Sequence, residues 1–266
     1  MTGPAPEGAG EWQIPHFELN EGTRQTGDLV VKPTTGIRLQ TVTRQNVSEV
    51  DPRTLGGDAK GALAYRLLQR NWDLSLGVEI LDAWITGQVL HEVTLREGQT
   101  RTSLTAHFNV ANASIRSLLI QLPLTDEDEI KSLRASGSSV SDLVRTAPDS
   151  DIWEIQFKRR VVGKVDVRIE YERRGERLDE TEFLSPIAFP DARQLSYYFG
   201  VRAGGRLELE AGELPSGWQH ADWNTVPQAL RESGNRNAPV LTLRTISPEQ
   251  PLSILAQRHS LAEALK

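Results

Sequence analysis

The sequence predicts an all-β protein made of antiparallel β-sandwich modules in series, with few short helices. Apolar and polar residues alternate over many short segments, which is typical of strands with one buried face. Turns rich in glycine, such as those around Gly98, Gly137, Gly163 and Gly204, separate these segments. Helical periodicity is confined to 126–133, 227–232 and 255–265. Many short strands with regular turns and few helices favour sandwiches.

The strands follow one another along the whole chain. The expected strands are 74–80, 83–95, 102–110, 118–123, 151–157 and 163–171, with shorter ones at 207–209 and 241–243. The clearest is 163–171, where Val165, Val167 and Ile169 share one face and charged residues occupy the other. This alternation predicts a strand with its apolar face on a core and its charged face in solvent.

Chain order divides the protein into three blocks. Residues 1–10 form a flexible lead or tag remnant, 11–82 a β-rich module A, 83–174 a β-sandwich module B, and 175–266 a β-rich module A′. The charged, turn-prone tract 173–180 is a plausible junction. Each block contains 70 to 95 residues, a usual size for a small sandwich module.

Blocks A and A′ resemble each other, and we interpret A′ as a repeat of A. The offset is 171 residues for Pro15 and Pro186, 170 for Val31 and Val201, 171 for Thr54 and Thr225, and 178 for Leu74 and Leu252. The increase coincides with extra polar residues around 229–237, and loops tolerate such insertions. Because Ala264 aligns with Thr86, the order A–B–A′ predicts that another B block follows in a longer protein.

The charge balance and the absence of cysteine exclude several classes of protein. With 36 acidic and 30 basic residues the net charge is −6, which argues against general nucleic-acid binding. The chain has no cysteine, so it has no disulfide, thiolate metal site or cysteine nucleophile. No apolar stretch is long enough to cross a membrane, and the N-terminus lacks the pattern of a signal peptide. The low lysine content, six residues, favours a GC-rich bacterial source.

The sequence contains no motif of a catalytic or cofactor site. Nucleophile-elbow, zincin, P-loop and dinucleotide-binding patterns are all missing. His220 and Asp222 pair an imidazole with a carboxylate, but the sequence nominates no further metal ligand. The carboxylates 126–129 lack the spacing of a calcium loop and suit a solvated turn. We therefore predict no catalytic residue, no metal and no cofactor.

Tryptophans are the other candidates for ligand or partner contact. Trp84 lies on the polar face of its strand, and Trp218 and Trp223 flank His220 and Asp222 in a polar, turn-rich segment. Exposed aromatic rings form binding hot spots. The alternative is structural: Trp84 covers a seam between modules, and Trp218 and Trp223 fix a long loop.

Two of the five histidines lie on strands of block B. His91 falls on the apolar face with Val89 and Val93, and His107 falls on the polar face of the next strand. This placement predicts a buried or rim histidine in each case, and not a metal ligand.

Block B carries a resemblance to known modules. Its long strand 84–95, the strand 102–110, the apolar strand ending in Leu122-Pro123 and the alternating strand ending at Tyr171 resemble sandwich modules found in tandem in very large bacterial envelope-associated proteins of poorly known function. The block is also loosely similar to the sandwich domain that precedes von Willebrand-type modules in inter-alpha-trypsin inhibitor heavy chains. The resemblance covers 83–172 and implies an immunoglobulin-like sandwich, with no site residue carried over.

These observations together predict a non-catalytic structural or interaction fragment of a larger bacterial multi-module protein, periplasmic or extracellular. Its expected partners are other modules of the same protein or an envelope protein, with no membrane span in this segment. One alternative is a carbohydrate-binding module that uses the exposed tryptophans on a glycan. Another is an accessory domain of a polysaccharide-active enzyme.

Overall fold

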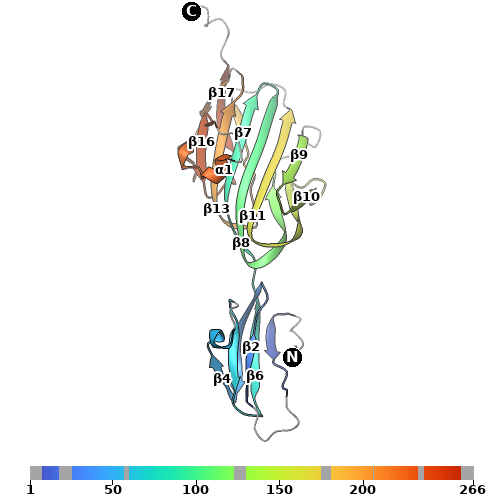
Figure 1. The fold of residues 1–266 in the computed structure, drawn as a ribbon. Coiled ribbons are helices and arrows are strands. Elements are labelled where there is room, and N and C mark those ends of the chain that lie inside the picture. The colour runs from blue at the N-terminus through green and yellow to red at the C-terminus, as the bar shows by residue number, and fades with distance from the viewer. Residues whose placement is uncertain are drawn as a thin grey trace, which may run out of the picture. The chain divides into compact units, whose positions relative to one another are not determined.

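The computed structural model describes residues 8–17, 26–56, 60–122, 130–174, 181–205, 207–232 and 237–258 (Figure 1). The chain divides into two compact units. Unit 1 comprises residues 1–83 with 112–114, and unit 2 comprises 84–111 and 115–266. Each unit is described by itself.

Unit 1 is a sandwich of two three-stranded antiparallel sheets. Its elements are β1 (Gly10–Gln13), β2 (Gly27–Val31), β3 (Ile37–Gln45), β4 (Val47–Val50), the 3-10 helix η1 (Pro52–Leu55), β5 (Leu63–Leu67) and β6 (Asp73–Ile80). One sheet has the order β1-β6-β3 and the other β2-β5-β4. Tyr65, Leu74 and Leu76 are fully buried between them, with Trp72 beside them. The alternation of these residues along their strands explains why both sheets bury one face.

Unit 2 contains the remaining strands in one large and one small sheet. Its elements are β7 (Trp84–Arg96), β8 (Gln99–Gln121), β9 (Ile130–Ser136), β10 (Val140–Arg145), β11 (Ile152–Arg174), β12 (Thr181–Leu184), β13 (Ala192–Ala203), β14 (Leu207–Ala211), β15 (Gln219–His220), the 3-10 helix η3 (Trp223–Thr225), α1 (Gln228–Glu232), β16 (Leu241–Thr245) and β17 (Leu252–Arg258). The eight-stranded sheet has the order β10-β11-β8-β7-β13-β16-β15, with β9 also on β11. The small sheet has the order β12-β17-β14.

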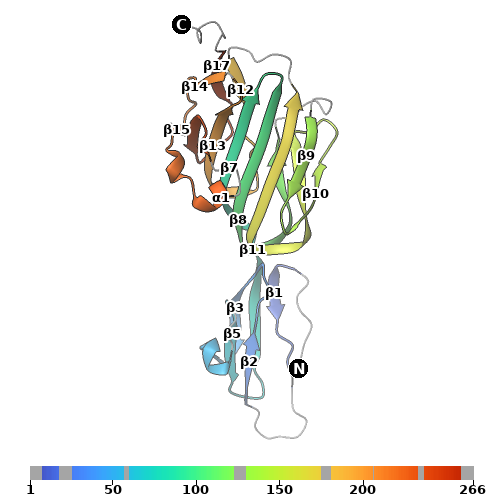
Figure 2. The same ribbon diagram turned by 45° about the horizontal axis from the view of Figure 1, so that its top comes forward.

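The long strands β8 and β11 each serve two parts of unit 2, because both bend midway. β8 passes through Asn112 with a φ of 66°, and β11 passes through Gly163 with a φ of 84°. The β8–β11 register shifts beside Val161. Figures 1 and 2 show β7, β8 and β11 side by side before this bend. The bend lets the inner faces of both halves bury apolar residues such as Ile120 and Val167.

The second half of unit 2 reproduces unit 1 strand for strand. Its sheets β12-β17-β14 and β13-β16-β15 match β1-β6-β3 and β2-β5-β4 in order and direction. The registers match as well. Val31 pairs with Leu63 and Val201 with Leu241; Leu39 pairs with Val78 and Leu209 with Ala256. Both pairs are displaced by 170 residues in the first strand and 178 in the second.

The 3-10 helices of the two repeats are also built alike. The Asp51 carboxylate accepts the Arg53 N–H at 2.9 Å, and the Asp222 carboxylate accepts the Asn224 N–H at 2.8 Å. In each helix a threonine hydroxyl donates to the backbone oxygen of that aspartate. A side chain that caps its own turn is a local device, so it appears unchanged in both repeats.

The structure corrects the alignment of the first strand. Gln13 pairs with Ser75, and the position displaced from it by 170 residues, Phe183, pairs with Ser253. Buried Ile14 therefore corresponds to buried Leu184. The two prolines had suggested 171, but they lie beyond the strands, where pairing no longer fixes the register.

The structure also corrects the separation of residues 83–174 from 175–266. β13 pairs in parallel with β7 from Ala192–Ile85 to Ala203–Leu95, so both segments share the large sheet. Parallel pairing joins strands distant in sequence, and local alternation cannot reveal it. Apart from this pair, the described ladders are antiparallel, which confirms the all-β, sandwich-type fold class.

We call the contact between these two strands the β7–β13 seam, and a buried polar network crosses it. His91 Nδ1 lies 2.8 Å from the Tyr197 hydroxyl, which donates to the Ile187 carbonyl at 3.0 Å. The Phe199 ring packs on the His91 ring at 4.6 Å. Burial lowers the pKa of His91 to about 3 and raises the pKa of Tyr197 well above its usual value. His91 is therefore a neutral core residue at neutral pH, as its strand face predicted.

Of the three helical segments expected, one is a helix. α1 occupies 228–232, whereas 130–136 and 252–258 are strands β9 and β17; the remaining parts of those two expected helices lie outside the described residues. Pairing with β11 and with β12 and β14 overrides the weak local preference of these segments. No helix in the described ranges is long and apolar enough to span a membrane.

Candidate functional site

Trp218 is a core residue, so the expectation that it contacts a ligand is wrong. It is 5% exposed, and its ring meets Tyr197 edge-on at 6.2 Å and Phe199 at 6.0 Å. It corresponds to buried Val47 of unit 1 at an offset of 171. Trp218 thus fills the second repeat, which agrees with the structural alternative.

The other four candidates do not converge on one site. Trp84 is 48% exposed at the start of β7. His220 and Asp222 are exposed, and Asp222 is used as the cap of η3. Trp223 is half-buried against a cluster containing Leu90 on the outer face of the large sheet. None of these four residues lines either of the two grooves described below.

The described residues hold no metal cluster. Within them, no group of three histidine, aspartate or glutamate side chains is placed to bind an ion. The acidic run 126–129 lies outside the described residues. His107, on the polar face as expected, has its Nδ1 2.6 Å from Asp166 Oδ1, a pair of neighbouring strands.

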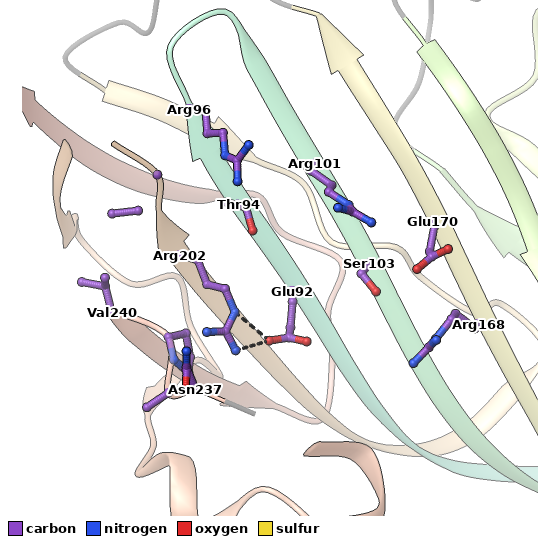
Figure 3. Close-up of a pocket in the computed structure, with 14 residues that line it drawn as sticks. Glu92, Thr94, Arg96, Arg101, Ser103, Arg168, Glu170, Arg202, Asn237 and Val240 are labelled. Atoms are coloured by element: carbon purple, nitrogen blue, oxygen red, sulfur yellow. Dashed lines mark hydrogen bonds and ion pairs between the residues drawn. The ribbon is translucent and has the colours of Figure 1, made fainter. Parts of the chain in front are cut away.

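The largest concentration of charge around a cavity is a groove of about 590 Å³ on the outer face of the large sheet (Figure 3). We call it the arginine groove. Its lining residues are Glu92, Thr94, Arg96, Arg101, Ser103, Arg168, Glu170, Arg202, Ala203, Gly204, Asn237, Ala238, Pro239 and Val240. They come from β7, β8, β11, β13 and the segment before β16.

Strand alternation and cross-strand register bring these side chains together. Arg202 lies opposite Thr94, and Thr94 lies opposite Arg101. The neighbouring row places Ser103 between Glu92 and Glu170. Residues two apart on a strand share a face, so each row adds polar groups to the same side of the sheet. Figure 3 shows the four arginines around Thr94, Ser103 and Glu92.

Glu92 and Arg202 form a buried ion pair in the wall of the groove. Glu92 Oε1 accepts from Arg202 Nε at 3.0 Å and from Nη2 at 2.6 Å. Their side chains are 8% and 11% exposed. The Arg202 guanidinium also lies 5.7 Å from the Trp223 ring centroid. The pair fixes β7 to β13 and neutralises one of the two groove carboxylates.

The second carboxylate is also neutralised, and two arginines are left over. Glu170 accepts from Arg134 Nε at 2.9 Å and is in contact with its Nη2. Arg101 has a loose contact, 3.9 Å, with Glu172. Among the described residues, Arg96 and Arg168 have no hydrogen-bond or ion-pair partner. The groove therefore carries unbalanced positive charge.

Gly204 determines how Arg96 lies at the rim. A Cβ at Gly204 would stand 2.4 Å from Arg96 Cγ and 3.0 Å from its Nε. The arginine therefore crosses the glycine backbone at a distance that no other residue allows. This close approach holds the guanidinium of Arg96 beside the groove.

A second groove of about 640 Å³ lies on the same face, around His107, Asp166, Gln88, Lys164 and Ser196. Leu90, covered by Val226 and Leu230, lies between the two grooves in sequence and on the same face. This second groove contains an internally paired histidine and carboxylate. It shows less uncompensated charge than the arginine groove.

The sequence analysis did not identify the arginine groove. Its arginines lie at alternating positions on the polar faces of four strands, and each strand alone resembles an ordinary solvated face. The parallel β7–β13 pairing that brings Arg202 beside Thr94 is a long-range feature. The only local signal was the abundance of arginine on the polar faces of block B.

Comparisons with known proteins do not identify a family. No protein-family model matches the chain, and no curated protein matches it. Among solved structures, the chain is similar to an M1 zinc metallopeptidase from Deinococcus radiodurans bound to a Tyr-Ser-Ala substrate, at 11% identity and a TM-score of 0.35. A two-domain M1 zinc metallopeptidase bound to L-tryptophan gives 9% and 0.33. Each match covers 65% of this chain and 42% of that chain, and likeness this distant carries no functional inference.

Proposed function

We propose that the chain is a non-catalytic interaction module of a multi-module protein, and that its arginine groove binds an acidic extended segment of a partner protein. One observation carries the proposal: Arg96 and Arg168 line the groove without a partner among the described residues, while Glu92 and Glu170 are already paired. A ligand with carboxylates would complete these two arginines.

The chemistry of arginine favours carboxylates as the ligand groups. A guanidinium presents a planar array of donors that matches a carboxylate in bidentate geometry. Thr94, Ser103 and Asn237 add neutral hydrogen-bonding groups between the arginines. Two unpaired guanidiniums from β7 and β11 suit a ligand that carries more than one carboxylate along its length.

The lining favours a peptide over a sugar. No aromatic side chain lines the groove, so it offers no ring for stacking on a pyranose. Trp223 contacts Arg202 from outside the lining and is half-buried. The buried state of Trp218 also removes one of the residues on which a carbohydrate site was expected.

The test is a titration of the full chain with a fluorescently labelled hexaglutamate peptide, monitored by anisotropy. We expect saturable binding that weakens as salt rises. Arg96→Gln and Arg168→Gln should each raise the Kd roughly fivefold to tenfold, since a charge-assisted hydrogen bond contributes about 1.5–3 kcal/mol when buried and less at a rim. Arg159→Gln, an exposed arginine on the same strand as Arg168, is the matched control and should leave the Kd unchanged.

Two results would contradict the proposal. Equal binding of hexaglutamate to wild type and to the Arg96→Gln, Arg168→Gln double variant would show that the groove is not the site. Tight binding of polygalacturonate oligosaccharides with no binding of hexaglutamate would replace the peptide by an acidic glycan.

A further inference from the structure

The two repeats differ at one sheet edge. β2 of unit 1 corresponds to β13 of unit 2, since both are the first strand of the same three-stranded sheet in the same register. β13 uses both edges: one pairs with β16 and the other pairs in parallel with β7. Among the described residues, β2 pairs only with β5.

The side chains of the two strands record the same difference. Tyr197, Phe199 and Val201 of β13 are at most 1% exposed. The corresponding Leu29 and Val31 of β2 are only half-buried, although both pack on the core of unit 1. The apolar face of this sheet therefore continues to its edge in unit 1, where β7 supplies the cover in unit 2.

The edge of β2 carries little of the protection that isolated edges usually have. Natural edge strands are blunted by charged side chains, proline or bulges. Asp28 is the one charged residue within β2, and it is paired with Arg66 of β5 at 3.0 Å. The strand continues as Leu29, Val30 and Val31, with no bulge in its pairing to β5. Pro33, which has no N–H, sets the limit beyond which a ladder cannot extend.

We propose that the β2 edge is an acceptor for an added strand, joined in parallel, from a β-sandwich of the 84–174 type. The strand it fits resembles β7: apolar side chains at alternate positions facing the core, polar ones on the other face. By correspondence with the β7–β13 seam, Gly27 would lie opposite a residue like Val89, and Val31 opposite a residue like Val93. The seam in unit 2 is then the internal copy of an interaction that unit 1 makes with another sandwich.

The chain's own β7 cannot supply this strand, because its two edges hold β8 and β13. The test therefore uses a synthetic peptide with the sequence of residues 84–96, added to the full chain. Amide hydrogen exchange of residues 27–31 is measured by NMR. We expect slowing of the outward amides of β2 by at least tenfold at saturating peptide. β4, the opposite edge of the same sheet, is the built-in control and should not change.

Two variants keep the test specific. A peptide carrying Leu90→Pro cannot complete the ladder and should give no protection. In the protein, Val30→Lys places a charge on the acceptor strand and should weaken the effect several-fold, whereas Val42→Lys on β3 of the other sheet should not. Val42 is 51% exposed, so its substitution tests for a general effect of added charge.

The orientation is read from a spin label at the C-terminal end of the peptide. Parallel pairing predicts stronger broadening of the Val31 amide than of the Gly27 amide. The reverse order would overturn the parallel geometry. No protection at millimolar peptide, or equal protection of β2 and β4, would overturn the acceptor. Protection that rises with protein concentration in the absence of peptide would assign the edge to a second copy of the chain.

Discussion

One topology occurs twice in this protein and is completed in two ways. In unit 1, two three-stranded sheets close on their own core around Tyr65 and Leu76. In unit 2, the same six strands keep the same registers, but β13 also extends the large sheet through β7. The difference between the repeats therefore lies in one sheet edge and not in the strand order.

This comparison shows how a small sandwich gains burial by sharing a sheet. Corresponding positions such as Leu29 and Phe199 differ in exposure because a partner strand covers one edge and not the other. Larger side chains occupy the covered copy, since they fill space that the added strand encloses. The same joint places Arg202 beside Glu92 and so forms the arginine groove.

The largest expected difference comes from the matched pair Phe199→Ala and Leu29→Ala. Phe199 is fully buried against His91 and Trp218, so its truncation should cost unit 2 about 3–5 kcal/mol of unfolding free energy. Half-buried Leu29 should cost unit 1 about 1–2 kcal/mol. Urea unfolding of both variants measures this. Equal losses would mean that the two edges are equally covered.

The second comparison concerns ion pairs. Glu92→Ala leaves the guanidinium of Arg202 buried without its partner and should cost about 3 kcal/mol. The pair of Asp28 and Arg66 is solvent-exposed, so Asp28→Ala should cost less than about 1 kcal/mol. Thermal unfolding at low and high salt measures both. A loss for Glu92→Ala as small as that for Asp28→Ala would show that solvent reaches the Glu92–Arg202 pair.

The third comparison is the acid response. Burial lowers the pKa of His91 to about 3 from about 6.5, so the unfolded chain takes up a proton before the folded one does. The stability contributed by neutral His91 is present above about pH 6.5 and is lost as pH falls toward 3, at about 1.4 kcal/mol per pH unit. His91→Leu should remove this slope from unit 2 and leave unit 1 unchanged. An unaltered slope in the variant would assign the acid sensitivity to other groups.

The smallest expected effect is one in which the repeats should agree. Asp51→Ala and Asp222→Ala each remove a capping acceptor from a 3-10 helix, and each should cost about 0.5–1 kcal/mol. Hydrogen exchange of the Arg53 and Asn224 amides gives the readout. A marked difference between the two variants would show that one helix is held by tertiary contacts and not by its cap.

Sequence reasoning was most successful for local features. Alternation identified strands such as 163–171, and the near-constant offset between Val31 and Val201 pointed to the repeat. It could not reveal the parallel β7–β13 pairing, because that ladder joins residues about 107 positions apart with no turn between them. Trp218 was misjudged because a polar, turn-rich flank does not show that its ring points into the core. The arginine groove depends on the same long-range pairing.

The most direct test of this comparison is native-state hydrogen exchange of the full chain across a denaturant series. We expect amides of β8 and β16 to share one free energy of opening and one denaturant dependence, because the β7–β13 seam joins them in a single sheet. Amides of β5 and β6 should share a different one. If β16 instead separates from β8 and opens with its own denaturant dependence, as β5 does, the second repeat is an independent module and the fused sheet is not a cooperative unit.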